Sequence, residues 1–119
     1  MPSSNINCEA ARLLGITEAF RNAWDAMPMS VAALFIKIAE RDLAGDPLGI
    51  TEAGEAVGMS LASASRNALL LDYKLAERGA EPLGLVRAAR HPRDYRRKVL
   101  KLTETGRMFY GRLASLVKA

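Results

Sequence analysis

The chain has 119 residues, half of them apolar, and this length and composition predict one small folded domain spanning residues 1–119. No apolar run approaches the roughly 20 residues that span a bilayer. The first ten residues lack the blocks of a signal peptide, so we expect a cytoplasmic protein without a membrane partner. One cysteine, Cys8, excludes an internal disulfide and is expected to be functionally silent. With one histidine and no glycine-rich phosphate loop, we expect no metal, no cofactor and no enzymatic activity.

Positive charge is concentrated in the second half of the chain. Residues 1–59 hold four Lys or Arg against eight Asp or Glu, whereas residues 60–119 hold thirteen against five, which together give the net charge of +4. Seven of the cations fall between Arg87 and Lys101, opposed by Asp94 alone. Such clustering is what a polyanionic partner requires, although a solvated basic surface without a partner is the alternative.

The first part of the chain predicts two helices and a loop. Apolar residues recur at helical spacing between residues 5 and 26 and indicate an amphipathic helix. Pro28 interrupts this pattern, and Ser30 is expected to cap a second helix that ends near Asp42. The apolar side of the second helix is formed by Val31, Leu34, Phe35 and Ile38. Residues 45–49, GDPLG, follow as a loop.

Residues 50–78 are predicted to contain a helix-turn-helix. Thr51 is expected to cap a short helix that runs through Val57, and Gly58 supplies the positive φ that a tight turn between helices demands. Ser60 is expected to cap the next helix, which starts at Leu61. This arrangement is typical of a helix-turn-helix motif.

The second helix of this motif, expected over residues 61–72, begins with small or hydrogen-bonding side chains that suit close approach to a major groove. An arginine there can bind guanine and an asparagine can bind adenine, while serine hydroxyls suit bases or phosphates. The expected DNA-reading residues are Ser60, Ala62, Ser63, Ser65, Arg66 and Asn67. The alternative is an exposed helix start without a ligand.

Residues 83–103 predict a basic β-hairpin. Residues 91–94, HPRD, have the chemistry of a turn, and β-compatible residues flank them on both sides. The expected DNA contacts of this hairpin lie within residues 87–101, and they are Arg87, Arg90, Arg93, Arg96, Arg97 and Lys98. A helix-turn-helix followed by a basic hairpin is typical of a winged helix, in which the hairpin contacts the DNA backbone or the minor groove.

Two stretches resemble the wing of MarR-type regulators, which usually reads D-x-R-D-x-R and ends in L-T-x-x-G. They are HPRDYR at residues 91–96 and LTETG at residues 102–106, and the resemblance covers residues 50–107. It implies a winged-helix homodimer that binds a pseudo-palindromic operator and represses transcription. It also implies that Asp94 organises the wing and that Arg96 enters or lines the minor groove.

The chain departs from the family pattern at three places. His91 stands where the family has its first wing aspartate, so a wing ion pair is either missing or pH-dependent. The run from Ser65 to Gly84 is longer than usual, and we expect the recognition helix to extend to about Glu77, with Gly79 as its stop. Finally, a single C-terminal helix over residues 104–117 is expected where the family has longer ones.

The terminal helices are expected to form a homodimer interface, because a two-fold operator requires a dimer and both helices carry apolar stripes. Core packing within one chain is the ordinary alternative. The candidate interface residues are Leu13, Phe20, Trp24, Phe109, Leu113 and Leu116.

Together these patterns predict a mainly α protein with a small β-hairpin, a winged helix-turn-helix with additional N- and C-terminal helices. The expected function is sequence-specific binding of double-stranded DNA by a dimeric transcriptional repressor. The alternative is a winged helix used in replication or partition, or as a protein-binding adaptor. The sequence does not indicate a small-molecule effector.

Overall fold

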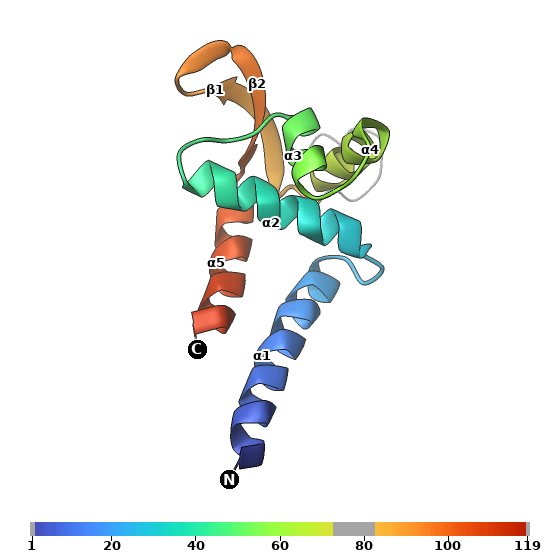
Figure 1. Cartoon of the computed structure of the whole chain (residues 1–119), viewed down its shortest axis with the longest axis vertical. Coiled ribbons are helices and arrows are strands. Elements are labelled where there is room, and N and C mark those ends of the chain that lie inside the picture. The colour runs from blue at the N-terminus through green and yellow to red at the C-terminus, as the bar shows by residue number, and fades with distance from the viewer. Residues whose placement is uncertain (1, 73–82, 119) are drawn as a thin grey trace.

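A computed structural model describes the backbone of residues 2–72 and 83–118, with side chains from residue 8 onward. Helices and one hairpin follow in chain order, and they confirm the mainly α fold with a small β-hairpin (Figure 1). The elements are α1 (Pro2–Ala23), α2 (Met29–Leu43), α3 (Ile50–Ala56), α4 (Leu61–Leu71), β1 (Val86–His91), β2 (Asp94–Leu102) and α5 (Glu104–Lys118). Helix α2 crosses the molecule, with α1 and α5 on one side and the hairpin, α3 and α4 on the other.

Three phenylalanines join α1, α2 and α5 into the core. The ring centroid of Phe109 lies 5.3 Å from that of Phe20 and 5.4 Å from that of Phe35. Aromatic pairs at such distances contribute about 0.5–1.5 kcal/mol beyond their buried area. Phe20, Phe109 and Leu113 are all at least 92% buried within this one chain. Their assignment to a dimer interface was therefore wrong, because these three side chains pack in the core where α1, α2 and α5 meet.

The observed end of α1 and the observed start of α2 differ from the predicted ones. Helix α1 ends at Ala23 rather than at residue 26. Helix α2 has Pro28, not Ser30, at its N-cap position, where φ is −64° and ψ is 146°. The carbonyl of Pro28 accepts hydrogen bonds from the backbone N–H groups of Val31 and Ala32, so the helix begins before the serine. Proline suits this position because its φ is already fixed near this value.

The cap of α3 was also predicted two residues too late in the chain. Gly49, not Thr51, is the N-cap residue, and its carbonyl accepts from the N–H of Ala53 at 2.9 Å. The Glu52 carboxylate accepts from the Gly49 N–H at 3.3 Å. A Cβ at Gly49 would lie 3.0 Å from the carbonyl oxygen of Lys98, so a glycine permits the close approach of β2.

Helices α3 and α4 form the predicted helix-turn-helix. Gly58 has a φ of +76°, as the turn demands, and Ser60 caps α4 by accepting from the Ser63 N–H at 3.2 Å. A Cβ at Gly54 would lie 2.6 Å from the Cβ of Ala64, which is fully buried. The two helices thus cross closely because two small residues meet at their contact.

Helix α4 ends sooner than predicted. It stops at Leu71, and Asp72 is extended, with a ψ of 144°, and forms a parallel bridge with Val86. The predicted extension to about Glu77 is therefore wrong at Asp72, because this residue leaves the helix to pair with β1. The predicted stop at Gly79 lies outside the described residues.

Strands β1 and β2 pair antiparallel, with Arg90 opposite Lys98 and an irregularity between Arg90 and His91. The base of this hairpin, which we call the wing, is attached to the body through two backbone N–H groups of β2. The N–H of Leu100 donates to the carbonyl of Leu48 at 2.9 Å, and the N–H of Leu102 donates to the Asp42 carboxylate at 2.9 Å. The base of the wing is therefore fixed to the rest of the domain by hydrogen bonds.

The L-T-x-x-G pattern at residues 102–106 has a direct structural cause. The Thr103 hydroxyl caps α5 by accepting from the Gly106 N–H at 3.0 Å, and the Thr103 N–H donates to the carbonyl of Leu85 at 3.0 Å. A Cβ at Gly106 would lie only 1.9 Å from that same carbonyl oxygen. Threonine and glycine at this spacing thus let α5 start directly against the chain that enters β1.

Candidate nucleic-acid interface

Helix α4 presents one side to solvent and one side to the core. Ala64, Ala68 and Leu71 are buried, as the spacing of a helix packed on one face requires. The opposite side carries the exposed residues Leu61, Ala62, Arg66 and Leu69, with Ser65 half-buried beside them. Of the predicted reading residues, Ala62, Ser65 and Arg66 lie on this side.

The other predicted reading residues already have hydrogen-bond partners within the chain. Ser60 and Ser63 form the cap, and the Arg66 guanidinium lies 3.4 Å from the Ser63 hydroxyl. The side-chain amide of Asn67 donates to the Ser30 hydroxyl at 3.4 Å and lies 3.6 Å from the sulfur of Met59. Asn67 is half-buried and must leave these contacts before it can reach a base.

Asp94 organises the turn end of the wing. Its Oδ1 accepts from the backbone N–H of Arg96 at 3.1 Å and lies 3.3 Å from the Arg96 Nε. Across the hairpin, the Arg90 guanidinium donates to the carbonyl of Tyr95 at 2.8 Å. These contacts fix the backbone on both sides of residue 95.

His91 joins the wing to the loop between α2 and α3. Its side chain is 4% exposed, its Nε2 lies 3.0 Å from Asp46 Oδ1, and its Nδ1 accepts from the Arg93 N–H at 3.0 Å. Because Nδ1 accepts, the proton of the neutral ring lies on Nε2 and is donated to Asp46. The position that departs from the family pattern thus holds a buried histidine, whose partner Asp46 lies 45 residues away in the sequence.

Asp46 is also paired with arginines. Arg41 lies 2.7 Å from its Oδ2, and Arg93 lies 3.7 Å from its Oδ1. The pKa of the Asp46 carboxyl is lowered from its ordinary value, chiefly because it accepts a hydrogen bond from His91 and a second one from Arg41. Arg93 in addition donates to the carbonyl of Gly45 at 3.4 Å. One carboxylate therefore holds two wing residues against α2.

A second ion pair docks the wing on the helix-turn-helix. The Arg97 guanidinium lies 2.8 Å from Glu52 Oε1 on α3, and the two side chains are 40% and 52% exposed. Arg97 was predicted as a DNA contact, and in this structure its guanidinium is paired with a carboxylate.

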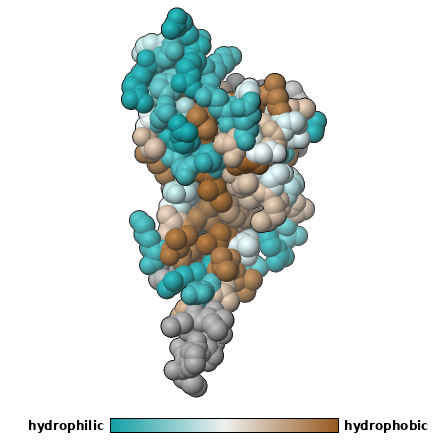
Figure 2. Space-filling model, viewed as in Figure 1, coloured by the Kyte–Doolittle hydropathy of each residue, from teal (hydrophilic) through white to brown (hydrophobic). Residues whose placement is uncertain are grey.

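The remaining wing cations project from the hairpin. The side chains of Arg96 and Arg93 are 92% and 72% exposed, and Arg87, Arg90 and Lys98 are exposed as well. Hydrophilic side chains cover the wing on the face drawn in Figure 2. Lys98 lies directly across the strand pair from Arg90, and two like charges opposite each other favour an anion between or beside them.

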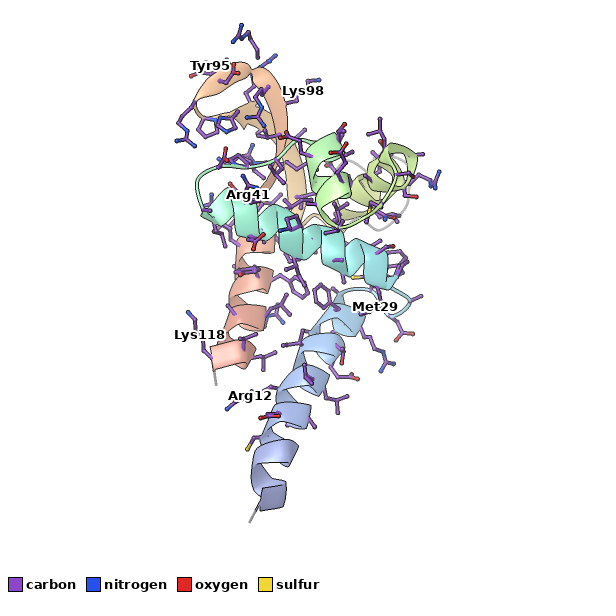
Figure 3. All side chains as sticks on the ribbon, viewed as in Figure 1. Arg12, Met29, Arg41, Tyr95, Lys98 and Lys118 are labelled. Carbon is purple, nitrogen blue, oxygen red and sulfur yellow. The ribbon has the colours of Figure 1, made fainter. Side chains whose placement is uncertain are left out.

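Sequence reasoning missed three exposed apolar residues in this region. Leu61 and Leu69 are 53% and 45% exposed on the solvent side of α4, and Tyr95 is 77% exposed at the tip of the wing (Figure 3). Leu61, Ser65 and Leu69 recur every four residues, so helical spacing from the cap was a usable signal for the two leucines. For Tyr95 the sequence offered no comparable signal, because the pattern of the wing indicated only its cations.

The candidate dimer residues that are not core residues lie on the terminal helices. Leu13 is 66% exposed, Trp24 is half-buried, and Leu116 is half-buried where its side chain approaches Gly15 of α1. Apolar side chains gather where α1, α2 and α5 meet on the face drawn in Figure 2. A groove there is lined by Ile16, Ile36, Tyr110, Leu113, Ala114 and Val117.

A helix-turn-helix followed by an antiparallel basic hairpin, with α4 and the wing both exposed, defines a winged helix-turn-helix protein. Comparison with solved structures specifies the type. The MarR-like transcriptional regulator from Thermotoga maritima superposes with a TM-score of 0.56 at 20% identity, over 79% of this chain and 57% of that protein. Rv1404 from Mycobacterium tuberculosis gives a TM-score of 0.59 at 11% identity, over 98% of this chain and 71% of that protein. The chain has the MarR-type winged-helix fold.

This chain spans a little over half the length of the Thermotoga regulator, 57% of it. No protein-family model matches its sequence, and none of the curated proteins is similar to it in sequence. Within residues 2–72 and 83–118, no helix is long and apolar enough to cross a membrane.

Proposed function

We propose that this protein is a transcriptional regulator that binds double-stranded DNA in a sequence-specific way and has no enzymatic activity. Helix α4 enters the major groove, and the wing contacts the backbone and the minor groove of the neighbouring segment. The observation that carries this proposal is the joint exposure of Arg66 on α4 and of Arg93, Arg96 and Lys98 on the wing. Exposed guanidinium and ammonium groups are the side chains that bind phosphates and base edges of DNA, and here they lie on both α4 and the wing.

The proposed assembly is a homodimer on a pseudo-palindromic operator, which the protein occupies as a repressor. Support comes from the exposed apolar side chains on the side of the molecule away from the wing, among them Leu13 and Leu14 of α1, Ile36 of α2 and Val117 of α5. A two-fold axis through this side leaves both copies of α4 and of the wing free. Two half-sites then lie about 10 base pairs apart, or a multiple of that, from centre to centre.

Selection of bound duplexes from a random pool, followed by footprinting, tests this function. We expect a sequence with two-fold symmetry and protection of both half-sites. Arg66→Ala should weaken binding by about 1–3 kcal/mol and relax the preferred sequence if its guanidinium binds a guanine. Arg12→Ala removes the same charge at the opposite end of the molecule and serves as the matched control (Figure 3). Undetectable DNA binding at low salt would contradict the proposal and favour a protein-binding winged helix.

A further inference from the structure

The tip of the wing carries a large aromatic residue that the folded chain does not use. Tyr95 is 77% exposed, and its ring and hydroxyl make no hydrogen bond, ion pair or ring contact with any described residue. The apolar residues at the base of the wing behave differently, since Val99 and Leu102 are almost fully buried. Tyr95 thus contributes nothing to the core or to the docking of the wing.

The backbone that carries Tyr95 is nevertheless held firmly. Its carbonyl accepts from the Arg90 guanidinium at 2.8 Å, and the residues on either side of it are joined by the bond from the Arg96 N–H to Asp94. Behind the tip, the bond between His91 and Asp46 attaches the turn to the body. The ring is therefore presented from a fixed position, which reduces the entropy lost when it contacts a partner.

The surroundings of the ring specify the chemistry of that partner. The exposed charged neighbours along the wing include the cations Arg93, Arg96 and Lys98, and the carboxylate next to Tyr95 in the sequence, Asp94, is paired with Arg96. A row of cations attracts a polyanion such as DNA. An aromatic ring among these cations can then pack against sugars and bases and release its bound water. The same positive charges exclude a cationic partner, such as the amine of a peptide.

We propose that Tyr95 is a DNA-contacting residue and that its ring packs against deoxyribose and base edges in the minor groove. This inference rests on the proposed DNA-binding function and adds an uncharged contact to it. The wing then contributes two separable kinds of binding energy. Arg96 and Lys98 contribute the salt-dependent part, and Tyr95 contributes a part that does not release counterions.

The test measures the affinity for a selected duplex as a function of salt, using fluorescence anisotropy. Tyr95→Ala is expected to weaken binding at least about five-fold, as base–aromatic contacts do, with an unchanged slope of log affinity against log salt. Arg96→Ala, the comparison variant, should instead reduce that slope by about 0.9. Tyr95→Phe keeps the ring and should bind within about two-fold of the wild type. Circular dichroism should give one melting temperature for wild type and both Tyr95 variants.

Three outcomes would overturn the inference. They are equal affinities of wild type and Tyr95→Ala, an equal loss for Tyr95→Phe and Tyr95→Ala, or a slope changed by Tyr95→Ala. The second outcome would assign the effect to the hydroxyl and a phosphate. A wild-type protein that binds no duplex would instead refute the proposed function, so the two failures are distinguishable.

Discussion

The ion pair between Glu52 and Arg97 leads to a prediction about DNA affinity. In the free protein this carboxylate occupies a wing guanidinium at 2.8 Å, so Arg97 reaches a phosphate only after the pair is broken. Both side chains are about half-exposed, and such pairs contribute about 0.2–1 kcal/mol to stability. Glu52→Gln should therefore tighten DNA binding by about 1.4- to 5-fold, the equivalent of that energy. The amide oxygen of glutamine still accepts from the Gly49 N–H, so α3 keeps its cap.

A double-mutant cycle separates the broken pair from the general effect of removing a negative charge. Glu55→Gln is the matched control, because Glu55 lies on the same helix, is exposed and has no ion pair among the described residues. Anisotropy titrations of wild type, Glu52→Gln, Arg97→Gln and the double variant give the coupling between the two residues. The gain from Glu52→Gln should exceed that from Glu55→Gln, shrink as salt rises and fall to the control value without Arg97. Equal gains for the two glutamate variants would refute the reasoning.

Two further predictions concern the attachment of the wing. Gly106→Ala would place a Cβ 1.9 Å from the carbonyl oxygen of Leu85, and it should destabilise the protein by about 1–3 kcal/mol or more in thermal unfolding. Gly111→Ala in the same helix meets no atom within 4 Å and should stabilise by up to about 1 kcal/mol, so equal effects would contradict the packing account. Asp46, with its pKa lowered below the ordinary 3.8, stabilises the folded state above that pH and less as the pH falls through the folded pKa. The melting-temperature difference between wild type and Asp46→Asn should therefore be constant near neutrality and shrink below pH 3.8, and a constant difference down to pH 3 would count against this role.

The order of the elements could be predicted from the sequence because local signals determine it. Helical spacing, Gly58 at the turn, Ser60 at the cap and the HPRD turn each act within a few residues, and the elements follow in the order that these signals predict. The caps at Pro28 and Gly49 were missed because both residues lack the side-chain oxygen by which caps are usually recognised.

The finer arrangement of the site could not be predicted, because it depends on contacts between distant parts of the chain. Asn67 was expected to read a base, and its amide meets Ser30, 37 residues earlier. Arg97 meets Glu52 across 45 residues. An apolar stripe likewise does not indicate whether its partner is the same chain, so Phe20 and Phe109 were assigned to a dimer although they pack against each other.

Helix α2 acts as a spacer between the two parts of the proposed DNA surface. Near its start, Ser30 contacts Asn67 of α4, and near its end, Asp42 accepts from the backbone of β2. The twelve steps between these residues span about 18 Å along the helix axis. Deleting one residue between them would shorten that span by about 1.5 Å and turn one anchor by about 100° about the axis. The length of α2 therefore sets the spacing and relative orientation with which α4 and the wing would contact neighbouring grooves of one duplex in the proposed complex.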